Sequence, residues 1–260
     1  MNIAGWHKCS FVDYPGQIAV TLFTPGCNMR CSYCHNRATL VDRALHHVIP
    51  LETVFSFLRK RRGLINAVVI TGGEPTMQKG LEEFLSQLRE MGFLLKLDTN
   101  GSNPGKLAAI LNAELVNYVA LDIKAPPEKL PGIINVPLDP ELIEQSKRLI
   151  ALSGVDYEFR TTVIPQLTFE DMLAIGSSIS GAKRYALQQY KKPRILPDCQ
   201  DPAASRPAHA PAFFLRLQHA MQDWFEELIL RDVDLTQRTK PTSPTTEAAR
   251  SRRYARAVGE

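Results

Sequence analysis

The stretch CNMRCSYC at residues 27–34 holds three of the five cysteines of the chain, in the spacing C-x3-C-x2-C. Thiols this close in sequence are usually metal ligands or redox groups. Zinc would need a fourth ligand, and the neighbouring His35 directly follows Cys34, so the two side chains rarely reach one tetrahedral ion together. A redox dithiol of Cys31 and Cys34 would leave Cys27 unexplained. An iron–sulfur cluster is the third alternative.

A [4Fe–4S] cluster normally takes four thiolates, so three cysteines would leave one iron open. An open metal position can bind a small molecule and react with it. This interpretation therefore requires a ligand pocket elsewhere in the chain. Cys9 and Cys199 stand alone in the sequence and are expected to be ordinary thiols.

The bulk composition is that of one large α/β domain, with 260 residues that are 44% hydrophobic and 22% charged. The net charge of +4 is mild, and the arginines that cluster near residues 250–256 do not by themselves establish nucleic-acid binding. No apolar run is long enough to span a bilayer, and the first ten residues lack the apolar core of a signal peptide. We therefore expect a cytoplasmic protein with reduced thiols and no membrane partner.

Strand-like and helix-like segments alternate along the chain, which is the rhythm of a parallel sheet. The expected strands are residues 18–24, 67–71, 93–98, 118–123, 157–164 and 183–190, and the expected helices are residues 51–62, 79–91, 104–112, 140–152 and 168–179. Six such units fall short of a closed eight-unit barrel. The pattern predicts an α/β fold with parallel strands, arranged as an open, partial (β/α)6 barrel in residues 1–190.

The remaining residues are predicted to form two further segments. Residues 191–235 read as a proline-rich connector followed by a closing amphipathic helix at residues 213–230. Residues 236–260 are polar, rich in proline and threonine, and basic, which predicts a disordered or loosely helical tail.

Candidate site residues follow successive strands. The sequence GGEP at residues 72–75 follows the second expected strand, and its glycines would let the backbone approach a ligand while Glu74 offers a carboxylate for an ammonium group. Other polar residues at the strand ends or within the fifth strand are Asp98, Thr99, Asp122, Lys124 and Arg160. The carboxyl ends of parallel strands share one edge, so we expect all of them beside the cysteine loop.

These motifs resemble those of a known superfamily. The C-x3-C-x2-C spacing with Tyr33 before the last cysteine resembles the radical S-adenosylmethionine (SAM) superfamily, and CNMRCSYCHN at residues 27–36 is similar to the glycyl-radical-enzyme activases within it. FVDYPGQIAVTLFTPGCNMRC, LDIK and FRTTVIP most resemble the longer activating proteins of anaerobic ribonucleoside-triphosphate reductase, over about residues 5–190. DTN at residues 98–100 and LDIK also resemble pyruvate formate-lyase activating enzyme.

The resemblance implies a role for each motif. The cysteines Cys27, Cys31 and Cys34 would hold the cluster, and Gly72, Gly73 and Glu74 would hold the amino group of SAM. Tyr33 would lie near the adenine, and Arg160 near the SAM carboxylate or ribose. Asp98, Thr99 and Asp122 would help to bind a monovalent cation, with Lys124 in the cofactor and substrate environment. His35 and Asn36 follow the cluster motif without an assigned role.

The implied reaction begins with one electron from a flavodoxin or ferredoxin, which cleaves SAM to methionine and a 5′-deoxyadenosyl radical. That radical would take a hydrogen atom from a glycine of a partner enzyme, with anaerobic ribonucleotide reductase as the expected partner. Three alternatives stay open: another glycyl radical enzyme such as pyruvate formate-lyase, a small-molecule substrate as in carboxy-deazaguanine synthase, and a binding protein whose basic tail contacts nucleic acid. The last predicts no SAM cleavage and a salt-dependent affinity.

Overall fold

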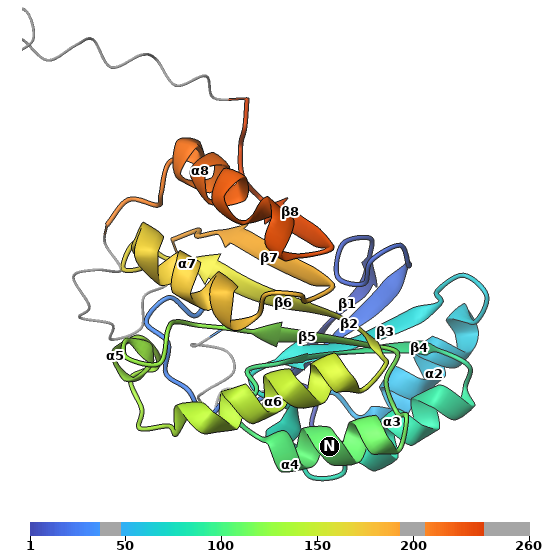
Figure 1. Cartoon of the computed structure of the whole chain (residues 1–260). Coiled ribbons are helices and arrows are strands. Elements are labelled where there is room, and N and C mark those ends of the chain that lie inside the picture. The colour runs from blue at the N-terminus through green and yellow to red at the C-terminus, as the bar shows by residue number, and fades with distance from the viewer. Residues whose placement is uncertain (37–47, 193–205, 237–260) are drawn as a thin grey trace, which may run out of the picture.

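The computed structural model describes residues 1–36, 48–192 and 206–236 (Figure 1). Its centre is one eight-stranded sheet in which the strands lie in chain order. The strands are β1 Gly5–Ser10, β2 Ala19–Thr24, β3 Ala67–Gly72, β4 Leu94–Thr99, β5 Tyr118–Asp122, β6 Asp156–Val163, β7 Arg184–Gln189 and β8 Glu227–Arg231. Strand β1 is antiparallel to β2, and every later neighbour pair is parallel. The expected α/β fold with mostly parallel strands is confirmed.

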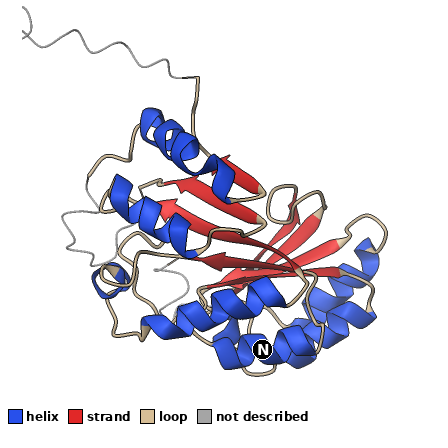
Figure 2. Cartoon of the chain, in the orientation of Figure 1, coloured by secondary structure: helices blue, strands red, loops and turns tan. Residues whose placement is uncertain are grey.

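The helices between the strands lie along one face of the curved sheet (Figure 2). They are α2 Leu51–Arg61, α3 Leu81–Glu90, α4 Pro104–Asn112, α5 Leu130–Ile134, α6 Pro140–Leu152, α7 Phe169–Ser178 and α8 Pro211–Met221. Side-chain caps explain where three of them start. Asn103 caps α4, Asp139 caps α6, and Thr168 forms a reciprocal capping box with Asp171 at the start of α7.

The two faces of the sheet differ in chemistry because successive side chains of a strand point to opposite sides. The face toward the helices contributes Val20, Leu22, Val68 and Ile70 to the main apolar core. The other face carries small residues on the first strands, such as Ala19 and Ala67.

Charged residues continue this inner face on the later strands. Lys96 and Glu158 are buried there at 3% and 1% exposure. The Nζ of Lys96 lies 2.6 Å from the carbonyl oxygen of Asp13 and 3.9 Å from Glu158. Arg231 of β8 closes the network with two bonds to the Glu158 carboxylate. The inner face is thus apolar on the first strands and carries a charged network on the later ones.

Two parts of the sequence prediction are wrong. The expected helix at residues 213–230 ends at Met221, and residues 227–231 instead form β8 along the outer edge of β7. The outer edge of β7 offers unpaired backbone groups, and pairing with them outweighs the helical periodicity. The first residues also form a strand, β1, that covers β2. The sheet therefore has two strands beyond the six expected.

Two further expectations concern segments at the margins of the structure. Within the described ranges, no helix is long and apolar enough to cross a membrane. The tail expected from residue 236 lies almost wholly outside the described residues, as does most of the connector.

Candidate functional site

Three loops stack where β2, β3 and β4 end, and glycine makes their contact possible. The N–H groups of Gly73 and Glu74 each donate a 2.9 Å hydrogen bond, to the carbonyl oxygens of Thr24 and Gly26 respectively. A Cβ on Gly73 would lie 1.8 Å from the Gly26 carbonyl oxygen. Gly72 has φ +113° and a Cβ there would lie 2.4 Å from the Thr24 nitrogen. These glycines hold the GGEP turn against the base of the cysteine loop.

The cysteine loop follows β2 and is anchored at its middle. Arg30 donates its backbone N–H to the Ile134 carbonyl, and the Asn135 side chain returns a bond to the Arg30 carbonyl. A tight turn brings Cys34 back toward Cys31 through an N–H bond of 3.2 Å. The three predicted cysteines line one cavity of about 200 Å³, with Cys31 buried and the other two half-buried.

Burial governs the protonation of these thiols. It raises the pKa of Cys31 to about 11, although Lys124 acts in the opposite direction, and it also raises the pKa of Cys27. Metal ligation requires thiolates, so iron binding would release protons here. The described residues contain no group of three His, Cys, Asp or Glu side chains that converges on a single metal ion.

Glu74 lies under the cavity and is fully buried. Its Oε1 accepts bonds from the Thr76 N–H, the Thr76 hydroxyl and the Thr99 hydroxyl, at 3.1, 2.6 and 2.7 Å. Its Oε2 accepts the Asn100 N–H at 2.7 Å. Burial raises the pKa of Glu74, and these four donors act to lower it. The carboxylate therefore ties the turn after β3 to the turn after β4.

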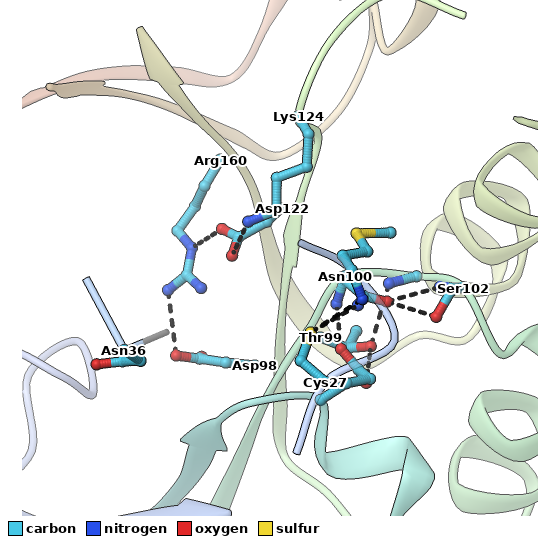
Figure 3. Close-up of polar contacts among 12 residues, drawn as sticks. Cys27, Asn36, Asp98, Thr99, Asn100, Ser102, Asp122, Lys124 and Arg160 are labelled. Atoms are coloured by element: carbon cyan, nitrogen blue, oxygen red, sulfur yellow. Dashed lines mark hydrogen bonds and ion pairs between the residues drawn. The ribbon is translucent and has the colours of Figure 1, made fainter. Parts of the chain in front are cut away.

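A second charged group stands at the ends of β4, β5 and β6 (Figure 3). The Arg160 guanidinium lies 2.6 Å from Asp122 and 3.3 Å from Asp98, while Lys124 lies 3.0 Å from the other Asp122 oxygen. Burial alone would raise the pKa of Asp122, but Arg160 and Lys124 hold it well below its usual range. Burial would likewise raise the pKa of Asp98, but the positive charges of Arg160 and Lys96 lower it. Both carboxylates are thus kept ionised.

Every predicted cofactor residue except Arg160 lines the cavity, and Arg160 reaches it through Asp98 and Asp122. Tyr33 is buried at 6% exposure, and its hydroxyl has no hydrogen-bond partner among the described residues. Three thiols, a close glycine–glycine contact, the half-buried ammonium group of Lys124 and an unpaired hydroxyl at one cavity fit a cluster with a polar organic ligand. The individual ligand roles, including the monovalent cation at Asp98, Thr99 and Asp122, remain predictions.

Sequence reasoning missed two groups of site residues. Asn28, Asn100 and Ser102 form a bonded set beside Cys27. Thr162 of β6 and Gln188 of β7 also line the cavity. Thr162 and Gln188 could have been found from the sequence, because side chains alternate between the two faces of a strand and this alternation places them on the same inner face as Arg160. Cys9 is exposed and outside the site, and Cys199 lies outside the described residues.

Comparisons with known proteins agree with this geometry. The family profile of the Radical SAM superfamily matches residues 21–178. The chain is 32% identical over 198 residues to "Putative glycyl-radical enzyme activating enzyme MJ1227" of Methanocaldococcus jannaschii, covering 73% of this chain and 80% of that protein. It is 36% identical to 7-carboxy-7-deazaguanine synthase of Methanopyrus kandleri, covering 39% and 47% of the two chains. It is 34% identical to pyruvate formate-lyase-activating enzyme of Staphylococcus aureus, covering 34% and 37%.

Solved structures share the fold at low identity. Streptococcus suis SuiB bound to S-adenosylmethionine aligns with a TM-score of 0.61 and 16% identity, over 81% of this chain and 51% of SuiB. The chain thus spans most of MJ1227, about half of SuiB and less than half of the other two relatives. The stacked glycine loops, the three thiols and the matched profile lead to one conclusion. The chain belongs to the radical SAM superfamily, whose enzymes use a [4Fe–4S] cluster and SAM, and it is homologous to glycyl-radical-enzyme activating enzymes.

Proposed function

We propose that this protein generates a glycyl radical on an anaerobic ribonucleoside-triphosphate reductase. The observation that carries the proposal is the match to a glycyl-radical enzyme activating enzyme over 80% of that relative's length, with the cysteine loop and GGEP turn inside it. The resemblance of FVDYPGQIAVTLFTPGCNMRC to the reductase activases favours this partner. The reaction would take place in the cytoplasm, with an electron from a flavodoxin or ferredoxin.

Different residues of the cavity would bind the cluster and SAM. Cys27, Cys31 and Cys34 would ligate the cluster, and the Gly72–Gly73 backbone would meet the amino group of SAM. When bound, the cluster supplies an electron for reductive cleavage of SAM, and the adenosyl fragment abstracts the hydrogen atom. Arg160 would place positive charge near the SAM carboxylate or ribose and Lys124 would place it in the cofactor and substrate environment, and ion pairs with Asp98 and Asp122 hold both side chains in position.

Two polar residues of the cavity lining support a peptide substrate. Thr162 and Gln188 offer a hydroxyl and a carboxamide, and neither side chain has a hydrogen-bond partner within the described ranges. Such groups match the N–H and C=O groups of a glycine segment. A small molecule with several polar groups is the second candidate, favoured by the 36% identity to 7-carboxy-7-deazaguanine synthase.

The test is an anaerobic assay on the reconstituted chain. The protein is loaded with iron and sulfide, reduced with dithionite, and mixed with SAM and the anaerobic ribonucleoside-triphosphate reductase from the same genome. We expect a glycyl doublet in the EPR spectrum together with 5′-deoxyadenosine, and neither with Cys31→Ala. Parallel samples hold pyruvate formate-lyase or the substrate of 7-carboxy-7-deazaguanine synthase. A product in one of those samples, with no glycyl signal on the reductase, would refute the proposed partner.

A further inference from the structure

Asn100 lies on the turn after β4, and its side chain faces the first cysteine of the cluster motif (Figure 3). The Nδ2 of Asn100 is 3.9 Å from the Cys27 sulfur and 3.0 Å from Oδ1 of Asn28. We propose that Asn100 is a positioning residue whose carboxamide donates an N–H to the Cys27 sulfur, orients that ligand and raises the reduction potential of the cluster. This inference rests on the cluster of the superfamily, and it does not depend on the partner enzyme.

The orientation of this carboxamide is fixed by its other partners. Its Oδ1 accepts the backbone N–H of Ser102 at 3.0 Å and the Ser102 hydroxyl at 2.6 Å. A backbone N–H can only donate, so the atom that faces it must be the oxygen, and the NH2 group must face Cys27 and Asn28. A flipped amide would set two donors against each other. The N–H therefore points toward the sulfur because of the bonding pattern.

The surrounding contacts make the arrangement rigid. Asn28 closes a ring by donating from Nδ2 to the Ser102 hydroxyl at 2.7 Å. The buried Glu74 carboxylate holds the Asn100 backbone N–H at 2.7 Å. Asn100 and Ser102 are themselves buried, at 6% and 8% exposure. A buried and fully bonded carboxamide loses little further freedom when it donates to a ligand sulfur.

Cys27 differs from the other two cysteines in its donors. Its sulfur also receives the backbone N–H of Met29 at 3.4 Å. In the part of the chain that the structure describes, no donor reaches the sulfur of Cys31 or Cys34. Donors to cluster sulfurs stabilise the more negative, reduced state, and the potential of a cluster depends on them. Through Asn100, the turn after β4 would therefore act on the iron bound by Cys27 and change the reduction potential of the cluster there.

The experiment measures the midpoint potential of the loaded cluster by EPR-monitored redox titration, without SAM or partner. Asn100→Asp keeps the acceptor for Ser102 and replaces the donor by an oxygen, and Asn100→Leu removes both. We expect a lower midpoint in both variants, with the larger shift for Asn100→Asp. Asn112→Ala, an exposed change at the end of α4, serves as the control and should keep the original midpoint.

Iron and sulfide content is determined on the same samples. An unchanged midpoint in loaded Asn100→Leu and Asn100→Asp would overturn the proposal. If these variants lose the cluster, Asn28→Ala decides, because Asn28 is exposed and its loss removes one bond to the Asn100 carboxamide and one to Ser102 while the Asn100 side chain itself is kept. A smaller shift in the same direction supports the tuning role, and no shift contradicts it. Activation of the reductase is not part of this readout, so failure of the proposed function would leave the result interpretable.

Discussion

Replacement of Glu74 separates a structural role from the SAM-binding role that the sequence resemblance implies. Its carboxylate accepts four hydrogen bonds from Thr76, Thr99 and Asn100 and is fully buried. In Glu74→Gln the oxygen best serves the three donors at Oε1, and the amide nitrogen then faces the Asn100 N–H. In Glu74→Ala the hydroxyl donors can turn away, but the backbone N–H groups of Thr76 and Asn100 cannot.

The magnitude follows from the number of donors left without a partner. A buried unsatisfied N–H costs about 1–3 kcal/mol. Glu74→Gln leaves one buried N–H group, that of Asn100, without a partner, and the variant no longer buries a charge. We therefore expect a loss of about 1–3 kcal/mol in the free energy of unfolding. Glu74→Ala leaves two backbone N–H groups without a partner and should lower the free energy of unfolding by about 2–6 kcal/mol. At roughly 2–4 °C per kcal/mol for a chain of this size, a loss of 3 kcal/mol lowers Tm by about 6–12 °C.

The assay is anaerobic urea unfolding of the chain without SAM, followed by circular dichroism. Glu83→Gln is the matched control, because Glu83 is exposed on α3 and should change the free energy of unfolding by less than about 0.5 kcal/mol. Unchanged unfolding of both Glu74 variants, combined with weaker SAM binding, would refute the structural role. It would instead favour direct contact between Glu74 and the SAM amino group.

Three further changes test other parts of the site. Gly73→Ala places a Cβ 1.8 Å from a backbone oxygen that cannot move aside, so unfolding in urea should show a loss of about 3 kcal/mol or more, against no change for Gly5→Ala, where nothing lies within 4 Å. Arg160→Met removes the partner that the half-buried Asp98 and Asp122 share but leaves each of them one lysine, Lys96 and Lys124 respectively, so it should cost about 1–3 kcal/mol at neutral pH. Arg160 holds the pKa values of both aspartates below their usual range, so its stabilisation is present at neutral pH and is lost as the pH falls through the lowered values. The difference in unfolding free energy between wild type and variant should therefore shrink in acid. A constant difference across an acid titration of unfolding would contradict this. Cys31→Ser should abolish binding of iron and sulfide in a reconstitution assay while the far-ultraviolet circular dichroism is kept, and retention of a full cluster would show that Cys31 is not a ligand.

Local sequence patterns carried much of the fold. The bounds of α4 and α6 match the prediction because proline after a capping side chain marks a helix start whatever the tertiary context. The six central strands match because β-branched and apolar runs of that length, between helices, pair as buried parallel strands. The placement of the cysteine loop and GGEP on one edge follows from parallel topology, in which all strands end on the same side.

Sequence by itself therefore determined the α/β class and the edge of the sheet on which the cysteine loop lies. The tertiary structure decided whatever depends on partners distant in the chain. Residues 227–231 became a strand because the free edge of β7 was available, and helical periodicity does not contain that information. Glu74 became a link between two turns because folding brought Thr99 and Asn100 to it, and Asn100 faces Cys27 for the same reason. Spacing in a sequence can identify groups that act together on one loop, whereas contacts between loops exist only after the sheet has brought the loops together.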